Sequence, residues 1–180
     1  MVYVLLGNGF EEIEALTAVD VLRRCGLEVR MAGIGGLEIT GGHGITVHAD
    51  CLVEDIDRKK TEMLVLPGGL GGVASILGCP RALEEIRAAH AAGRYVAAIC
   101  AGPTILAKLG ITDGKKTTSY PGTEAQMGAA LCQKDAGDVV DGKIVTGRAA
   151  GSAMAFALKL AELLCGKKTA EDAAKSLVVR

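Results

Sequence analysis

The chain has 180 residues, enough for one domain with a sizeable hydrophobic core, and 49% of its residues are apolar. Its 20 Lys and Arg residues nearly cancel its 21 Asp and Glu residues, and aromatic residues make up only 3%. Nucleic-acid binding is therefore not expected, because it relies on clustered positive charge and stacking aromatic rings. The apolar runs are too short to span a bilayer, and the N-terminus lacks the basic start of a signal peptide. We predict a single cytoplasmic domain over residues 1–180, with no membrane or nucleic-acid partner.

Six cysteines are scattered singly along the sequence, with no Cys-x-x-Cys pair and no histidine spacing that completes a zinc pattern. Reduced thiols in a reducing compartment are the simplest explanation, and we expect neither a metal nor another cofactor. Cys25 and Cys165 fall within predicted helices, where cysteine often serves as a small apolar side chain, so we expect both thiols to be inert.

Strand and helix patterns alternate through the first half of the chain and are separated by glycines. A hairpin is predicted where two short β-prone segments flank the turn 41–44. In chain order, the expected elements are strand 2–6, helix 12–25, strand 28–32, hairpin strands 37–40 and 45–48, a connection over 50–57, strand 63–66, a short helix ending at Leu77, and helix 81–92.

The second half continues this alternation, and Asp141-Gly142 is a strong signal for a two-residue hairpin turn. The expected elements here are strand 95–99, helix 101–109, strand 116–119, hairpin strands 138–140 and 143–146, helix 152–164, and helix 170–177. This order predicts a doubly wound α/β sandwich, with a mostly parallel sheet and helices on both faces. In such sheets, functional residues gather beyond the carboxyl ends of the strands.

Cys100 ends the apolar run Tyr95–Ile99 and is followed by small residues and Pro103, where a helical pattern begins. This succession of strand, tight turn and helix is typical of a nucleophile elbow, which lifts a reactive side chain out of the sheet. A buried structural thiol is the alternative, but Ala101 and Gly102 leave room around this sulfur. We predict a nucleophilic Cys100, with amides at the helix start lowering its pKa and binding an oxyanion.

Three glutamates follow the first predicted strand. Glu11 and Glu12 are typical of a helix start, where carboxylates favour the positive end of the helix dipole. Glu14 follows Ile13 and precedes Leu16, a position from which it can point either toward the sheet or toward water. If it points inward beside a thiolate, burial and like charge would keep it protonated, so that it could donate a hydrogen bond to sulfur and shuttle a proton.

Pro67-Gly68-Gly69 ends the predicted strand 63–66 with two residues that lack side chains. A plain turn would explain them, and so would a close approach of the backbone to a bound oxygen, with the Gly69 amide aimed at it. The run 68–72 lacks the Lys-Ser/Thr of a P-loop and the spacing of a dinucleotide motif, so phosphate binding is not indicated.

None of the three histidines stands close to Cys100 in the sequence. His43 falls in the predicted hairpin turn and His90 near the end of a predicted helix. We expect both side chains to be solvated or to have a capping role. Without an assigned base, a Cys-His hydrolase is difficult to build from this sequence.

Four segments resemble, in order, the ThiJ/PfpI superfamily, in the branch that contains the Parkinson-associated protein deglycase. They are Phe10–Ala15, Val65–Gly69, Ala97–Pro103 and Asp141–Arg148, and the resemblance extends from Val2 to about Leu177. It implies a flavodoxin-like fold and a homodimer.

The resemblance also implies a reactive cysteine at Cys100 and a protonated glutamate partner at Glu14. The residues expected to bind the substrate or its oxyanion are Gly68, Gly69, Ala101 and Tyr120. The implied activity is that of a glyoxalase without glutathione, which turns methylglyoxal into lactate, together with deglycation of early glyoxal adducts on proteins. Oxidation of the cysteine to a sulfinate and a redox-linked chaperone role are further family properties.

The sequence departs from the family pattern near Tyr120. Many members carry Thr-His-Pro near the cysteine, whereas this chain reads Ser119-Tyr120-Pro121. A phenol is a poor base at neutral pH, so proton transfer would fall mainly to Glu14. Two positions that resemble an arginine and a cysteine at the family's dimer interface are here approximately His43 and His48.

Three functions stay open on the sequence. An enzyme acting on a small aldehyde or a glycated protein is preferred. A redox sensor or chaperone is the alternative, and it predicts a sulfinate at Cys100 with little turnover. An amidase or peptidase is disfavoured, because Cys100 is followed by Ala101 rather than histidine and no base is assigned.

Overall fold

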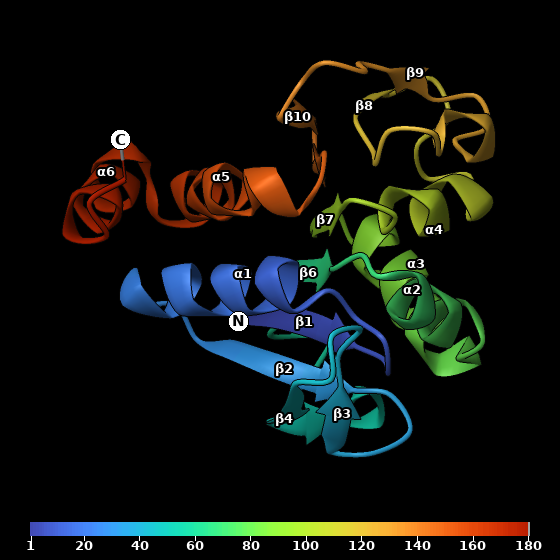
Figure 1. The fold of residues 1–180 in the computed structure, drawn as a ribbon, viewed down its shortest axis with the longest axis horizontal. Helices are drawn as coiled ribbons and strands as arrows, with labels where there is room; N and C mark the ends of the chain where they lie inside the picture. Colours follow the sequence, from blue (N-terminus) through green and yellow to red (C-terminus); the bar gives the residue numbers. More distant parts are fainter. Residues whose placement is uncertain (180) are drawn as a thin grey trace.

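A mostly parallel sheet organises the chain in the computed structural model, which describes residues 1–179 (Figure 1). The strands are β1 (Val2–Leu6), β2 (Val29–Gly33), β3 (Glu38–Thr40), β4 (Thr46–His48), β5 (Cys51–Leu52), β6 (Met63–Leu66), β7 (Tyr95–Ile99), β8 (Lys116–Thr117), β9 (Leu131–Cys132), β10 (Asp138–Asp141) and β11 (Ile144–Gly147). The α-helices are α1 (Glu12–Arg24), α2 (Leu70–Leu77), α3 (Pro80–Ala91), α4 (Pro103–Lys108), α5 (Ala153–Cys165) and α6 (Lys167–Ser176). Short 3-10 helices lie at Val53–Asp55, Glu124–Gln126 and Ala150–Ser152.

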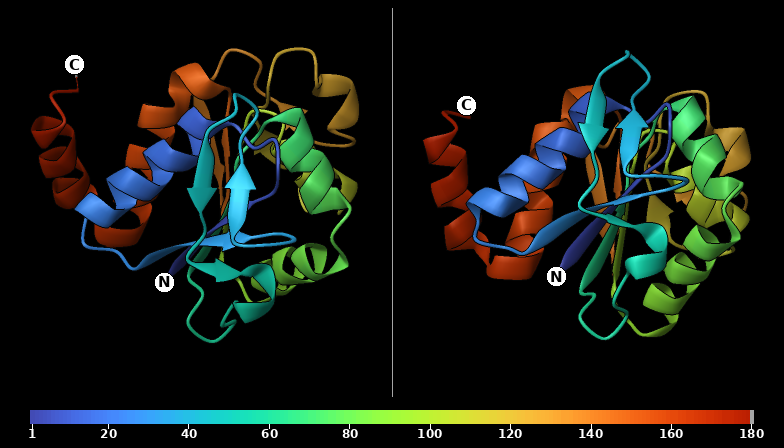
Figure 2. Two further views of the ribbon diagram at one scale, coloured as in Figure 1. Left: turned by 60° about the horizontal axis from the view of Figure 1, so that its bottom comes forward. Right: turned by 90° about the horizontal axis from the view of Figure 1, so that it is seen from below.

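Seven strands form the main sheet, in the spatial order β10-β11-β7-β6-β1-β2-β5. Neighbouring strands run parallel, except that β10 pairs antiparallel with β11 at one edge. Helices α1 and α5 cover one face, with α6 packed beside α5, and α2, α3 and α4 cover the other (Figure 1, Figure 2). This arrangement confirms the predicted flavodoxin-like, doubly wound α/β sandwich.

Successive side chains of β1 point to opposite faces of the sheet and are buried in different cores. Val2, Val4 and Leu6 belong to the core under α1 and α5, whereas Tyr3 and Leu5 belong to the core under α2, α3 and α4. Because strands covered on both faces are apolar throughout, the sequence marks β1, β6 and β7 clearly. The carboxyl ends of these three strands meet at one edge of the sheet, which positions the loops that follow them.

Both predicted hairpins are confirmed, β3 with β4 and β10 with β11. The turn of the second hairpin is Gly142-Lys143, one residue later than the predicted Asp141-Gly142, because Asp141 pairs with Ile144. Gly142 has φ 63°, the left-handed conformation that such a two-residue turn requires. The first hairpin forms a separate two-stranded ribbon rather than extending the main sheet.

Two segments differ between the prediction and the structure, because the strands that form there are only two residues long. The expected connection 50–57 contains β5, which pairs with β2 at the sheet edge. The expected strand 116–119 is limited to β8 and pairs with β9 in a separate sheet, outside the main one. Pairs this short are determined by tertiary contacts and leave no periodic pattern in the sequence.

Two helix boundaries also differ from the prediction. The helix after Cys100 begins at Pro103 rather than at residue 101, because proline suits the first helical position. The last helix begins at Lys167 rather than at residue 170, since Gly166, at φ 86°, ends α5 and directly precedes α6. Within residues 1–179, no helix combines the length and the apolar character needed to cross a membrane.

Candidate active site

Cys100 directly follows β7 and adopts φ 64°, in the left-handed region that favours glycine. Two hydrogen bonds hold this backbone: the Cys100 amide donates to the Gly147 carbonyl at 3.0 Å, and the Cys100 carbonyl accepts from the Tyr120 amide at 2.8 Å. A strained residue between a strand and a helix is the geometry of the predicted nucleophile elbow.

Glu14, in the first turn of α1, points into the protein and is only 1% exposed. Its Oε2 accepts a hydrogen bond of 2.7 Å from the Gly68 amide, and the Cys100 side chain lies beside the same carboxyl, on the other side of Gly68. Its other oxygen, Oε1, is buried and has no hydrogen-bond partner in the described part of the chain. A buried carboxyl in this situation favours carrying a proton, because a charge would lack solvation.

Gly68 and Gly69 occupy positions where a side chain would not fit. A Cβ at Gly68 would lie 2.7 Å from both the Cβ of Cys100 and Oε2 of Glu14. Gly69 has φ 82°, and its amide and that of Ala101 lie near enough to the Cys100 thiol to lower its pKa. The two glycines therefore allow the close backbone approach that the sequence suggested, with two amides facing the sulfur.

The pKa values of Glu14 and Cys100 are both raised. Burial raises the pKa of Glu14 to about 7, against the lowering effects of Gly68 and Cys100. Burial, and then the charge of Glu14, raises the pKa of Cys100 to about 12, which the amides of Ala101 and Gly69 offset only in part. The amides act in the expected direction, but a net lowering of the thiol pKa is wrong, because burial and Glu14 outweigh them. Between these pKa values the pair carries one negative charge and one proton.

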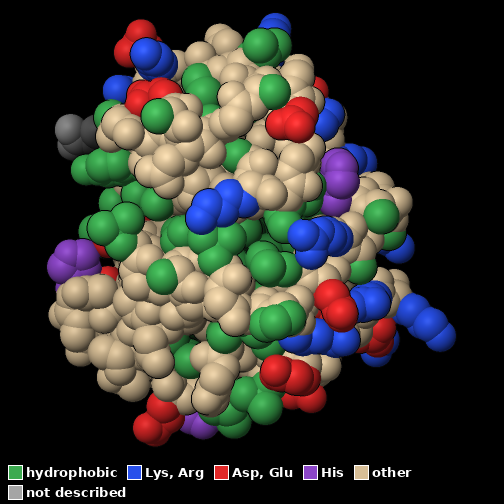
Figure 3. All heavy atoms as spheres, turned by 90° about the vertical axis from the view of Figure 1, so that its right-hand side faces the viewer, with side chains coloured by type: hydrophobic (Ala, Val, Ile, Leu, Met, Phe, Trp, Pro, Cys, Tyr) green, Lys and Arg blue, Asp and Glu red, His purple; other side chains and the backbone are tan. Residues whose placement is uncertain are grey.

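An open cavity of about 530 Å³ lies over Cys100. Its walls come from the loop after β1, the β3–β4 turn, the start of α2 and the loop that carries Tyr120. Figure 3 looks onto this side of the molecule, where hydrophobic side chains gather in the middle of the face. Of the predicted site residues, Cys100, Gly69, Ala101 and Tyr120 line the cavity, while Glu14 is buried behind it.

Sequence reasoning missed a contact between His43 in the β3–β4 turn and Glu12 on α1. The ring Nδ1 of His43 lies 2.9 Å from Oε2 of Glu12, and the His43 amide donates to Oε1 at 2.7 Å. Glu12 is buried, not solvated as a helix-start residue would be. Desolvation favours its neutral form, yet the hydrogen bonds from His43 and other donors lower its pKa to about 2. The same contact raises the pKa of His43.

One group of side chains among residues 1–179 has the spacing of metal ligands. Oxygen and nitrogen atoms of Glu11, Glu12 and His43 lie within 4.8 Å of one another. Carboxylate and imidazole are suitable ligands for several divalent metals. Here Glu12 and His43 form an ion pair with each other, and this pair explains their closeness without a metal.

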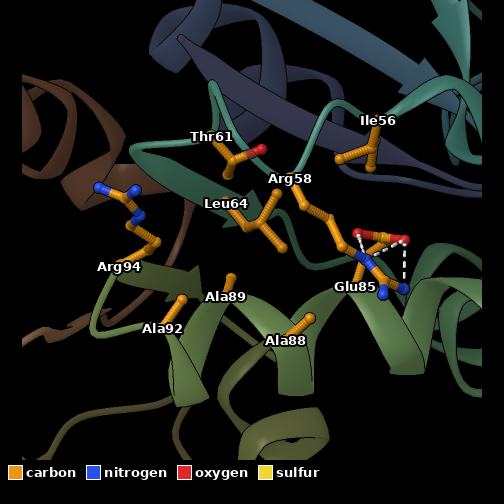
Figure 4. Close-up of a pocket in the computed structure, with 9 residues that line it drawn as sticks. All are labelled: Ile56, Arg58, Thr61, Leu64, Glu85, Ala88, Ala89, Ala92 and Arg94. Carbon is orange, nitrogen blue, oxygen red and sulfur yellow. Dashed lines mark hydrogen bonds and ion pairs between the residues drawn. The ribbon is translucent and has the colours of Figure 1, made fainter.

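A second cavity, of about 140 Å³, lies near the amino ends of β6 and β7 (Figure 4). Among the described residues that line it, Glu85 has the only carboxylate, which Arg58 and Arg81 neutralise, and none is a cysteine or histidine. The cavity over Cys100 is therefore the better candidate for chemistry.

The sequence matches the model of the DJ-1/PfpI family over residues 1–163. The chain belongs to the DJ-1/PfpI family. This membership confirms the resemblance that the sequence motifs indicated.

Similar family members cover nearly the whole chain. Protein dj-1beta of Drosophila melanogaster is 39% identical over 178 residues, which cover 98% of this chain and 95% of that protein. A Pyrococcus abyssi protein named a deglycase is 35% identical over 164 residues, which cover 91% of this chain and 98% of that one. The crystal structure of Drosophila melanogaster DJ-1beta has a TM-score of 0.96 at 38% identity and covers 99% of this chain and 97% of its own.

Proposed function

We propose that the protein is a cysteine-dependent, glutathione-independent glyoxalase and deglycase that acts on methylglyoxal or on its early protein adducts. The observation that carries this proposal is the position of Cys100 in the cavity wall, beside the buried carboxyl of Glu14 and between Gly69 and Ala101. A nucleophile, a proton carrier and an oxyanion site thus meet beside one cavity, as addition to an aldehyde requires. The Pyrococcus abyssi relative named a deglycase supports the same chemistry.

In the first step, the Cys100 sulfur attacks the aldehyde carbon of methylglyoxal. Glu14 takes the thiol proton as the sulfur–carbon bond forms, since the pair holds one proton and one negative charge near neutral pH. The amides of Gly69 and Ala101 stabilise the negative charge that develops on the aldehyde oxygen. Glu14 then returns the proton to that oxygen, which gives a hemithioacetal.

In the second step, Glu14 moves a proton from the former aldehyde carbon to the neighbouring ketone carbon, and the hydroxyl proton of the hemithioacetal passes to the former ketone oxygen. The product is a lactate thioester on Cys100, which water cleaves to lactate and the free thiol. With a protein adduct, the same sulfur displaces the modified amine or thiol, and Glu14 supplies the proton with which it leaves. Tyr120, which is 49% exposed and lines the cavity, donates a hydrogen bond to the ketone oxygen.

A redox role for Cys100 is a second candidate, favoured by the half-buried position of its thiol at an open cavity. Two peroxide molecules would convert the thiol to a sulfinic acid and leave two water molecules. The peptidase alternative lacks support, because the histidine that lines the cavity is paired with Glu12 rather than with Cys100.

We also propose that the protein acts as a homodimer. The apolar side chains of Ile13 on α1 and Ile45 in the β3–β4 turn are 57% and 53% exposed. They lie on neighbouring segments, because the Ile45 amide donates to Oε1 of Glu12 at 3.5 Å. An Ile13→Lys, Ile45→Lys double variant should shift the mass measured by light scattering from dimer to monomer. A monomeric parent protein would refute this assembly.

The activity is tested by lactate formation from methylglyoxal without glutathione. We expect the parent protein to form lactate and Cys100→Ala to lose at least about 100-fold in kcat/KM. Cys132→Ala, which removes a thiol outside the cavity, is the matched control and should keep the parent activity. Full turnover by Cys100→Ala would refute the mechanism. If no variant forms lactate, a peroxide titration with mass spectrometry of Cys100 tests the redox role.

A further inference from the structure

Cys25 and Cys165 meet at the ends of two packed helices. Cys25 is the C-terminal cap of α1, and Cys165 is the last residue of α5. The two helices lie side by side on the same face of the sheet (Figure 1). Both side chains pack against the same core cluster, and Cys165 lies near enough to raise the pKa of the Cys25 thiol, although most of the chain separates the two in sequence. The Cys165 thiol also donates to the Ala161 carbonyl at 2.9 Å.

The surroundings of this pair distinguish it from the other reactive or buried thiols. Both side chains are free, half-buried and packed against the core formed by α1 and α5. The groups that act on Cys51 and Cys100 are carboxyls, amides and an arginine, and none is another thiol. If these cysteines served only as small apolar side chains, nothing would require two partly exposed thiols to lie together.

We propose that Cys25 and Cys165 form a reversible redox pair, which closes to a disulfide between α1 and α5 when the protein meets a hydroperoxide. The site is separate from Cys100 and uses none of the residues that line its cavity. The inference therefore stands whether or not the protein is a glyoxalase.

The chemistry balances with one hydroperoxide for each disulfide. The Cys165 thiol gives up its proton as its sulfur attacks one peroxide oxygen. The oxygen–oxygen bond breaks, and the other oxygen takes that proton and departs as water or an alcohol. Cys165 is then a sulfenic acid. The Cys25 sulfur attacks it, displaces the hydroxyl group and gives up its own proton, so that a second water leaves. The two thiols lose two electrons, and the peroxide gains them.

Cys25 is suited to the resolving step. It lies beside Cys165, so its sulfur can reach a sulfenic acid formed there and release its proton to the departing water as it attacks. Burial and the neighbouring Cys165 raise the pKa of the Cys25 thiol, which leaves Cys165 as the residue that meets the peroxide first. A thiol reductant reverses the disulfide, whereas a sulfinate at Cys100 is not reversed in this way. The protein would thus carry one reversible and one irreversible response to peroxide.

The disulfide would join the helix that carries Glu14 to α5. Linking residues so distant in sequence restricts the unfolded chain, which stabilises the folded protein if the native geometry accepts the bond. We expect the oxidised protein to melt at a higher temperature than the reduced one, and the difference to disappear after reduction.

The test treats the full chain with increasing hydrogen peroxide, blocks the remaining thiols and digests it with trypsin without reduction. Trypsin releases Cys25 in the peptide 25–30 and Cys165 in the peptide 160–167. We expect these two peptides to appear joined, at about 2 Da less than their summed mass, which is the loss of two thiol hydrogens. The joined species should vanish after treatment with dithiothreitol and should persist in Cys100→Ala.

Cysteine variants distinguish disulfide formation at this pair from random oxidation of thiols. In Cys165→Ser, Cys25 should lose its partner and no joined peptide should form, whereas Cys79→Ser is the control that should keep it. If either serine variant fails to fold, the peptide map of the parent protein decides the question alone. Peroxide treatment that oxidises Cys100 but leaves Cys25 and Cys165 as free thiols would overturn the proposal, as would a disulfide between other cysteines.

Discussion

Glu14 on α1 and Gly68 at the end of β6 are joined by a hydrogen bond of 2.7 Å from the glycine amide to Oε2 of the carboxyl. Cys100 approaches the same glycine from β7, so that a Cβ at Gly68 would lie 3.0 Å from its sulfur and 2.7 Å from Oε2. Because Gly68 lacks a side chain, the thiol and the carboxyl can both lie close to it and to each other. Three neighbouring strand ends, those of β1, β6 and β7, are needed to build this arrangement.

Gly68→Ala should impair both activity and stability. The added methyl group meets Glu14 and the Cβ of Cys100 at distances that require one of them to move. We expect a loss of about 1–3 kcal/mol in the free energy of unfolding, the usual range for overpacking, with a larger proportional loss of lactate formation. Urea unfolding and kcat/KM for methylglyoxal measure the two effects.

Gly151→Ala is the matched control, since an added Cβ there has no neighbour within 4 Å. It should leave both quantities near the parent values. If Gly68→Ala behaved like Gly151→Ala, the spacing role of Gly68 would be wrong.

The elements around Cys100 could be predicted because their sequence signals are local. The apolar run before Cys100, the small residues after it and Pro103 specify strand, turn and helix, and the structure has them with φ 64° at the cysteine. The paired glycines after β6 likewise indicate that the backbone comes close to something, although the sequence does not say to what.

Properties that depend on contacts between distant segments could not be read from the sequence. The direction of the Cys100 pKa shift depends on how deeply the sulfur and Glu14 are buried, and the local motif indicated only the opposing amides. The ion pair between His43 and Glu12 joins two residues with ordinary roles in a turn and at a helix start. Placement of residues 1–180 in one domain and the proposed dimer stay predictions.

Activity should depend on pH through Glu14. Because burial raises its pKa to about 7, kcat/KM for methylglyoxal should rise as pH increases toward 7 and the pair with Cys100 loses its first proton. Glu14→Gln cannot accept that proton, so its residual activity should be at least about 100-fold lower and lack this rise. A parent profile that is flat below pH 7 would contradict the assigned role.

Stability should change over the same pH range in a defined direction. The folded pKa of Glu14 lies above the ordinary value of 4.5, so its protonated form stabilises the fold. This contribution is complete below pH 4.5 and is lost as pH rises through about 7. At about 1.4 kcal/mol per pKa unit, the shift from 4.5 to about 7 amounts to no more than about 3.5 kcal/mol. Urea unfolding of Glu14→Gln should lack this decline, and a decline equal to that of the parent would refute the assignment.

Cys100→Gly and Cys100→Ala should both be inactive yet differ in stability. An L-residue at φ 64° is strained, and glycine adopts this conformation without that cost. We expect Cys100→Gly to be more stable than Cys100→Ala by about 1 kcal/mol, measured by urea unfolding. Equal stability, or a more stable alanine variant, would show that the elbow stores no strain.

The ion pair of His43 and Glu12 should hold the β3–β4 turn against α1. His43→Ala removes the ring that lies 2.9 Å from Oε2 of Glu12, so amide hydrogen exchange in residues 41–45 should accelerate. The contact raises the pKa of His43, and this contribution is lost as pH rises above the ordinary value of 6.5 and through the raised one. Glu12 has its pKa lowered to about 2, so its contribution is lost as pH falls from 4.5 toward that value.

The difference in exchange between the parent and His43→Ala should therefore be largest between pH 4.5 and 6.5, where both partners are charged. His48→Ala is the control, because the ring of His48 bonds only to the neighbouring Ala49 carbonyl in the described chain. It should leave exchange in the turn unchanged, since β4 keeps its backbone pairing with β3. If exchange in residues 41–45 accelerated equally in the two variants, loss of either imidazole would loosen the hairpin. The ion pair would then have no particular role in positioning this wall of the Cys100 cavity.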